Sequence, residues 1–207
     1  MTEFDPDAVV VCGVPGSGKT TFARELARVL KWPILDLDTL TNPLFEYAGG
    51  EYLVDVPKAE PAGRASVNDV RYGCLYDTAR ENLLLGNNVI LVAPFTSERT
   101  YPEAWNRLVE KLGVPSSSVH LAWMDTPLLE IVDRVRKRGA ARDLEKIQEP
   151  ETFLSPDVMR RPGVEHIRIE GLLDQSVQIE RFIADLSPRI NSPMARKYVA
   201  QTNTPAH

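Results

Sequence analysis

One stretch near the amino end constrains the fold of this 207-residue chain more than any other: Gly13-Val14-Pro15-Gly16-Ser17-Gly18-Lys19-Thr20. It matches G-x-x-x-x-G-K-[ST], in which glycines let the backbone curl so that its N–H groups point inward at phosphate oxygens. An apolar, β-branched run at 8–12 precedes it, and a helical stripe follows, made of Phe22, Leu26, Val29 and Leu30. The sequence therefore predicts a strand, a phosphate-binding turn and a helix in direct succession.

The residue types in this turn also indicate its ligand. Lys19 is long enough to reach the β- and γ-phosphates of a nucleotide, and the Thr20 hydroxyl can ligate Mg²⁺. The amino end of the following helix adds partial positive charge. A glycine-rich turn that binds nothing is the alternative, which the flanking strand and helix disfavour. We expect ATP and Mg²⁺ as cofactors, bound by Gly13, Pro15, Gly16, Ser17, Gly18, Lys19, Thr20 and Thr21.

Short apolar segments alternate with helical patterns along the chain. The expected strands are 8–12, 33–37, 88–93, 119–124 and 165–169, and the helices after the first include 67–85 and stripes within 105–112, 128–135 and 179–186. This alternation predicts an α/β fold, a parallel sheet with helices on both faces. Thr126-Pro127 is expected to open the helix from 128, with Thr126 as its N-cap.

Two regions break this alternation. Residues 41–66 contain prolines and a glycine pair and are expected to form an irregular insert over the site. Residues 187–207 are polar without periodicity, and we expect a mobile tail. The sequence thus predicts one domain, 1–186, followed by that tail.

The composition bears on partners and location. A formal net charge of −5 gives no electrostatic reason to expect nucleic acid or an anionic membrane as partner. Cys12 and Cys74 are too few for a disulfide framework. No apolar stretch approaches the roughly 20 residues of a membrane span, and the acidic amino end is unlike a signal peptide. We expect a cytoplasmic chain, and the sequence leaves open whether it is a monomer or a homodimer.

Two carboxylates, Asp36 and Asp38, lie at the end of the second predicted strand. Ligands of open α/β sheets bind beyond the carboxyl ends of the strands, where the phosphate-binding turn also lies. If the strand persists, residues two apart leave the sheet on the same face. Asp36 could then contact Mg²⁺ or a substrate, while Asp38 accepts a proton from a substrate hydroxyl. The alternative is that Asp38 caps the following helix.

Arginines recur at helical spacing between the fourth and fifth predicted strands. Arg134, Arg138 and Arg142 share one helical face, and planar guanidinium groups suit the oxygens of a transferring phosphoryl group. The alternative is a solvated face with local ion pairs, such as Glu130 with Arg134.

Taken together, the turn at 13–20, Asp38 and the R-x-x-x-R spacing of Arg134 and Arg138 resemble small P-loop kinases. These include adenylate, shikimate and gluconate kinases and especially the zeta-toxin and chloramphenicol-phosphotransferase-like group, often described as AAA-family ATPases. The resemblance covers about 8–186 and implies the strand order 2-3-1-4-5 and a lid at about 136–150. It implies that Asp38 is the catalytic base, that Arg134 stacks on adenine and that Arg138 contacts phosphates. Arg142 has a weaker claim to the same phosphates.

The chain departs from many P-loop proteins at the third predicted strand. The third strand lacks the acidic metal-binding residue of many P-loop proteins, so the metal would rely on Thr20, the phosphates, water and Asp36. Residues 94–99 are expected to line the acceptor pocket. Between the Asp pair and the third strand, the candidate acceptor contacts are Arg71 first, then Tyr47, Tyr52, Arg64 and Tyr72. For each of them taken alone, the favoured alternative is packing or a surface position.

These residues favour a phosphotransferase that moves the γ-phosphate of ATP to a hydroxyl of a small molecule. Asp38 would be the base, Lys19 and Arg138 would stabilise transition-state charge, and Thr20 would hold the metal. A second hypothesis is a regulatory ATPase that presents a nucleotide-dependent conformation to a protein partner. A third, end-phosphorylation of nucleic acid, is disfavoured by the acidic balance and the lack of a basic stretch interleaved with aromatics.

Overall fold

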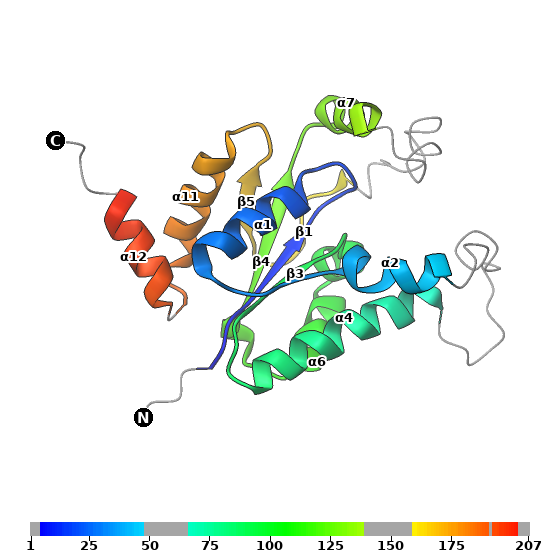
Figure 1. Ribbon diagram of the computed structural model, residues 1–207, viewed down its shortest axis with the longest axis horizontal. Helices are drawn as coiled ribbons and strands as arrows, with labels where there is room; N and C mark the ends of the chain where they lie inside the picture. Colours follow the sequence, from blue (N-terminus) through cyan, green and yellow to red (C-terminus); the bar gives the residue numbers. More distant parts are fainter. Residues whose placement is uncertain (1–4, 48–65, 139–158, 191, 203–207) are drawn as a thin grey trace.

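The computed structural model describes residues 5–47, 66–138, 159–190 and 192–202 (Figure 1), and only the backbone of Phe45, Glu46 and Arg138. Five strands form one sheet in the order β2-β3-β1-β4-β5, and all four neighbouring pairs are parallel. The strands are β1 (Ala8–Cys12), β2 (Ile34–Asp36), β3 (Val89–Val92), β4 (Val119–Asp125) and β5 (Ile167–Glu170). The predicted α/β class and the strand order are confirmed, with strand ends shifted by a few residues.

The described helices include those that cover both faces of this sheet. They are α1 (Lys19–Leu30), α2 (Leu37–Tyr47), α4 (Val67–Leu84), α5 (Thr96–Thr100), α6 (Pro102–Leu112), α7 (Leu128–Arg138), α11 (Gln175–Leu186) and α12 (Pro193–Thr202), with a 3-10 turn at Ser116–Ser118. Figure 1 shows α1, α11 and α12 on one side of the sheet and α4 and α6 on the other. None of the described helices is long and apolar enough to cross a membrane.

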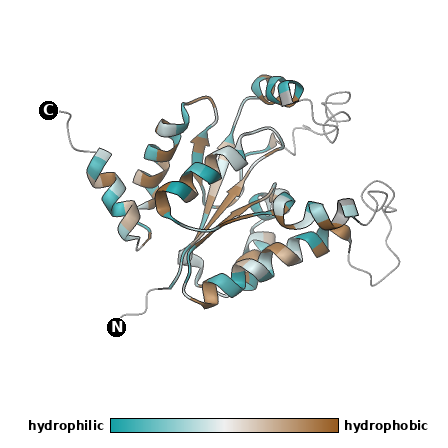
Figure 2. Cartoon of the chain, in the orientation of Figure 1, coloured by the Kyte–Doolittle hydropathy of each residue, from teal (hydrophilic) through white to brown (hydrophobic). Residues whose placement is uncertain are grey.

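The core follows from the alternation of side chains along the strands. Val9 and Val11 of β1 point to one face, where they pack in a cluster with α1, α11 and α12. Val10 and Cys12 point to the other face and pack with α4 and α6. Because β1 is covered on both faces, its entire sequence can be apolar. Figure 2 shows the hydrophobic colour on the strands between the two helical layers.

Helix α12 corrects the expectation for the carboxyl-terminal segment. Ala195 is fully buried, and Tyr198 and Val199 pack partly buried against the cluster formed by α1 and α11. These three residues fall at the i, i+3, i+4 spacing of a helical face, but one small and two half-buried side chains make a weak stripe, and the sequence analysis missed this helix. The insert expected at 41–66 begins as α2 and lies outside the described residues from 48 to 65. Of the expected lid, 139–150 also lies outside them.

Candidate active site

The turn between β1 and α1 has the backbone of a phosphate cradle. Gly13, Gly16 and Gly18 adopt φ values of +143°, +82° and +101°, a region that side chains with a Cβ rarely occupy. At Gly16 a Cβ would also lie 2.7 Å from Cγ2 of Val135 on α7, so α7 closes the turn from outside. Lys19 Nζ donates to the Val14 carbonyl at 2.8 Å, which places the ammonium group across the turn.

The donors of this turn fit a polyphosphate. Gly18 is the N-cap of α1, so the free N–H groups of the first helical turn start here. The Ser17 hydroxyl is fully buried and has no hydrogen-bond partner among the described residues, as expected of a group whose partner is a bound oxyanion or water.

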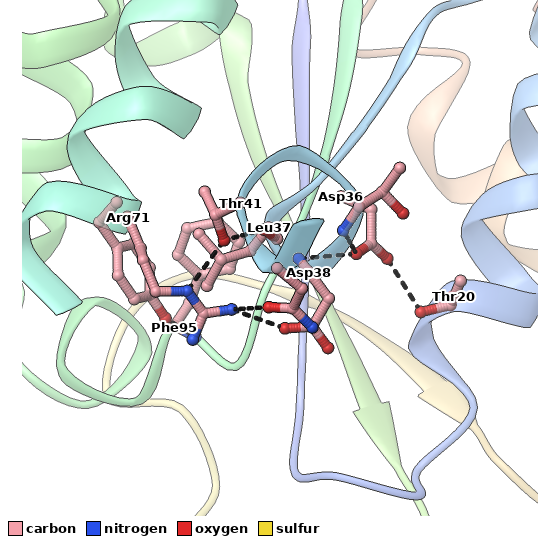
Figure 3. A network of polar contacts seen from close by, with 10 residues as sticks. Thr20, Asp36, Leu37, Asp38, Thr41, Arg71 and Phe95 are labelled. Carbon is pink, nitrogen blue, oxygen red and sulfur yellow. Dashed lines mark hydrogen bonds and ion pairs between the residues drawn. The ribbon is translucent and has the colours of Figure 1, made fainter. Parts of the chain in front are cut away.

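Thr20 and Asp36 form the part of the site suited to a hard cation. The Thr20 hydroxyl donates to Asp36 Oδ2 at 3.0 Å (Figure 3), so two oxygen atoms from α1 and β2 meet beside the turn. Hydroxyl and carboxylate oxygens are the ligand types Mg²⁺ prefers, with phosphate and water completing its shell. Across the described part of the chain, no group of three or more His, Cys, Asp and Glu could hold a metal by itself. The residues present therefore fit Mg²⁺ that arrives with a nucleotide.

The other oxygen of Asp36 caps helix α2. Asp36 Oδ1 accepts from the backbone N–H groups of Asp38 at 3.0 Å and Thr39 at 3.2 Å, the geometry of an N-cap. Two expectations are corrected here. The strand does not persist to Asp38, since β2 ends at Asp36 and α2 begins at Leu37, and the capping residue is Asp36 rather than Asp38.

Asp38 lies in the first turn of α2 and pairs with Arg71 of α4 (Figure 3). Arg71 Nη2 lies 2.8 Å from Asp38 Oδ1 and also donates to Asn42, while Nε donates to Thr41 Oγ1 at 2.9 Å. The Asp38 side chain remains 53% exposed, whereas that of Arg71 is 15% exposed. A carboxylate is thus held at a fixed position beyond β2 and is still open to a small molecule.

The segment after β3 forms a rigid wall next to this carboxylate. Phe95 is buried and adopts a left-handed backbone with φ 47°, rare for a bulky residue, and its N–H donates to the Tyr72 hydroxyl at 3.2 Å. Tyr76 donates to Glu98 at 2.8 Å. Burial, with the Glu98 carboxylate nearby, raises the pKa of both tyrosines. Arg71, Tyr72 and Tyr76 therefore tie α4 both to α2 and to the segment after β3.

Residues 94–99 are expected to line the acceptor pocket, but the large side chains of this segment are buried in the fold. Phe95 and Arg99 are both buried, and burial lowers the pKa of the Arg99 guanidinium. Arg99 Nη1 donates to the carbonyl of Arg160, and the Arg99 carbonyl accepts from Gly163 N–H at 2.8 Å. Thr96 and Ser97 are exposed and remain available to a ligand.

On α7, Arg134 lies against the phosphate-binding turn. Its Nη1 donates to the Ser17 carbonyl at 3.3 Å, its Nη2 to the Gly171 carbonyl at 2.8 Å, and its Nε to Glu130 at 2.7 Å. The ion pair between Glu130 and Arg134 is thus present, but the guanidinium also reaches the site.

Four of the predicted site residues, Tyr52, Arg64, Arg138 and Arg142, have side chains outside the described part of the structure. Arg138 ends α7 and only its backbone is described. Arg142, Tyr52 and Arg64 lie outside the described residues, and Tyr47 is 92% exposed at the end of α2. Conversely, the sequence pattern missed Thr41, Asn42, Thr126 and Gly171, whose hydrogen bonds join segments far apart in the chain.

Comparisons with solved structures find known kinases with a similar fold. A solved sugar kinase from Janibacter sp. HTCC2649 is 21% identical, covers 88% of this chain and 95% of its own, and superposes with a TM-score of 0.61. A gluconokinase from Sinorhizobium meliloti 1021 is 16% identical over 96% of this chain and 99% of its own, with a TM-score of 0.57. These likenesses show the fold.

Two further comparisons concern the sequence itself. A cytidylate kinase from Pyrobaculum arsenaticum is 51% identical over 45 residues, so the chain matches 24% of that protein's length. A family model described as an AAA domain matches residues 9–162. The match spans more than half of the chain and includes the phosphate-binding turn, Asp36, Asp38 and Arg134. The chain belongs to this AAA domain family of ATP-binding P-loop proteins.

Proposed function

We propose that this chain transfers the γ-phosphate of ATP to a hydroxyl group of a small molecule. The observation that carries the proposal is Asp38, a half-exposed carboxylate held by Arg71 at the same sheet edge as the P-loop. The kinase folds that superpose on the chain support a phosphotransferase, and a carboxylate at this position supports an alcohol as acceptor.

In this mechanism the phosphate-binding turn (the P-loop) and Lys19 would hold the β- and γ-phosphates, and Thr20 and Asp36 would hold Mg²⁺, which would neutralise phosphate charge. The acceptor oxygen attacks the γ-phosphorus as its proton passes to Asp38, and the bond from that phosphorus to the β–γ bridging oxygen breaks to leave ADP. Arg138 is proposed to stabilise the charge that develops on the phosphoryl oxygens. The products are a phosphate monoester, ADP and one proton.

Substitution of Asp38 by Asn tests the base. The amide still occupies the site but cannot accept the proton, so we expect transfer to fall by about 100-fold or more while the affinity for MgATP stays the same. Transfer is measured as ADP release over a panel of sugars, polyol acids, nucleosides and aminoglycoside-like or phenicol antibiotics, with detection of the phosphorylated product. Full transfer activity in the Asn variant would remove the base assignment.

The local match to cytidylate kinases favours an alternative reaction, in which the acceptor is the phosphate group of a nucleoside monophosphate and not a hydroxyl. A nucleoside monophosphate attacks through an oxygen that is already ionised, so it needs no base. CMP therefore belongs in the same panel. If CMP alone stimulates ADP release, and does so equally in the wild type and in the Asp38→Asn variant, the hydroxyl-transfer proposal fails.

The regulatory-ATPase alternative makes a different prediction. ADP release would be slow, no compound in the panel would stimulate it, and the γ-phosphate would appear only as inorganic phosphate. A hydroxyl compound that raises ADP release and becomes phosphorylated in equal amount excludes this alternative.

A further inference from the structure

Thr126 lies outside the set of residues expected to touch the nucleotide, yet its side chain reaches the P-loop. Its hydroxyl, in a residue only 2% exposed, donates to the Ser17 carbonyl at 2.9 Å. The same carbonyl accepts from Arg134 Nη1 at 3.3 Å. Helix α7 begins at Leu128, and the expected N-cap hydroxyl is instead engaged with a residue 109 positions earlier in the chain.

The consequence follows from the planarity of the peptide unit. The carbonyl of Ser17 and the N–H of Gly18 belong to the same peptide, no cis peptide is present among the described residues, and in a trans peptide these two groups point in opposite directions. Two donors that hold the Ser17 carbonyl therefore also fix the direction of the Gly18 N–H. That N–H lies at the start of α1, and it points away from Thr126 and Arg134.

The donors are themselves held in place. Arg134 Nη2 donates to the Gly171 carbonyl at 2.8 Å, and Gly171 N–H donates to the Asp125 carbonyl at 2.8 Å. Gln178 Nε2 fixes this turn by donating to the carbonyls of Glu170 and Leu173. A Cβ at Gly171 would lie 1.9 Å from Thr126 Oγ1, so only glycine leaves room for the hydroxyl.

We infer that Thr126 is a positioning residue for phosphate binding, and that with Arg134 it orients the Ser17–Gly18 peptide so that the Gly18 N–H donates to a phosphate oxygen. Because the peptide is oriented by the protein itself, the N–H need not reorganise when the phosphate binds. Arg134 consequently acts through the edge of its guanidinium on the turn, in addition to any stacking of its face on a base. The inference concerns phosphate binding and does not require that the phosphate be transferred.

The test compares Thr126→Val with the matched control Thr126→Ser, which retains the hydroxyl. Calorimetry with Mg²⁺–tripolyphosphate, which has no base, and with MgATP measures the effect on phosphate binding alone and on the whole nucleotide. We expect the Val variant to bind both about fivefold more weakly, the equivalent of one hydrogen bond, and the Ser variant to bind both like the wild type. The Gly18 amide resonance should shift on adding tripolyphosphate in the wild type and the Ser variant, and much less in the Val variant.

Three results would overturn the inference. These are wild-type affinity of Thr126→Val for tripolyphosphate, a loss confined to MgATP, and a Ser variant as weak as the Val variant. Thermal unfolding of the free variants shows whether the fold is retained, and Thr126→Ala replaces Thr126→Val if the valine lowers the melting temperature too far for titration. If MgATP binds as described but no acceptor is phosphorylated, the proposed kinase activity fails and this inference stands.

Discussion

Asp36 illustrates how one side chain serves two needs with its two oxygens. Oδ2 accepts from the Thr20 hydroxyl at the proposed Mg²⁺ site, and Oδ1 caps the helix that carries Asp38. In Asp36→Asn the amide oxygen can still cap α2, and the amide nitrogen can donate to the Thr20 hydroxyl. We therefore expect unchanged thermal stability but about a tenfold rise in the Mg²⁺ concentration needed for half-maximal MgATP binding, because the negative charge is lost.

Asp36→Ala is the matched comparison for that substitution. It removes the cap as well as the charge, so it should also lower the free energy of unfolding by about 1 kcal/mol. Chemical denaturation and Mg²⁺ titration of the two variants separate the roles. Equal stability of both variants would contradict the capping role, and an unchanged Mg²⁺ requirement in both would contradict the metal role.

Among the helices, α12 is the one whose contribution the sequence pattern least suggests. It closes the cluster over α1 and α11 through Ala195, with Tyr198 and Val199 partly buried. Deletion of residues 193–207 should expose that face and lower the free energy of unfolding by about 2 kcal/mol, from the loss of a few buried apolar groups. Urea denaturation of the full and shortened chains measures the difference.

The matched control for this deletion removes only residues 203–207. That shorter deletion leaves α12 complete and should retain wild-type stability. If the chain without residues 193–207 has the same free energy of unfolding as the full chain, α12 does not contribute to the stability of the folded state.

The sequence-based predictions are accurate for features set by neighbouring residues and fail for contacts between residues far apart in the chain. Strand β1 and the phosphate-binding turn were predictable because their signals are a local apolar run and a short motif, and the strand order followed from the resemblance to small P-loop kinases that this motif carries. The cap at Asp36 was not, since it depends on where β2 stops, and apolar periodicity locates strand ends poorly. The contact between Thr126 and Ser17 joins residues 109 apart, and no spacing rule reports such pairs.

For the molecule as a whole, one buried thiol and two largely buried tyrosine hydroxyls predict a loss of stability at alkaline pH. Burial raises the pKa of the Cys12 thiol from 9.0 to about 12, and burial also raises the pKa of Tyr72 and Tyr76. Above about pH 9 the unfolded chain releases protons that the folded chain retains, so the unfolded state is favoured and the free energy of unfolding falls as pH rises. Below that range these groups are neutral in both states and have no effect.

Urea denaturation at intervals from pH 7 to pH 10.5 measures this fall. Cys12→Ala removes one of the titrating groups, so its free energy of unfolding should decline less steeply between pH 9 and 10.5 than that of the wild type. Identical slopes in the two proteins would show that Cys12 ionises as readily in the folded chain as in the unfolded chain.

Every role proposed above requires that the turn at 13–20 bind the phosphates of a magnesium nucleoside triphosphate beside Asp38. Calorimetric titration of the full chain with MgATP tests it most directly, with MgGTP alongside and with Lys19→Ala and Asp38→Asn as paired variants. We expect one site per chain, with binding at least tenfold weaker in Lys19→Ala, which loses the cation at the β- and γ-phosphates, and unchanged in Asp38→Asn. No detectable binding of either triphosphate, or equal binding by wild type and Lys19→Ala, would contradict it.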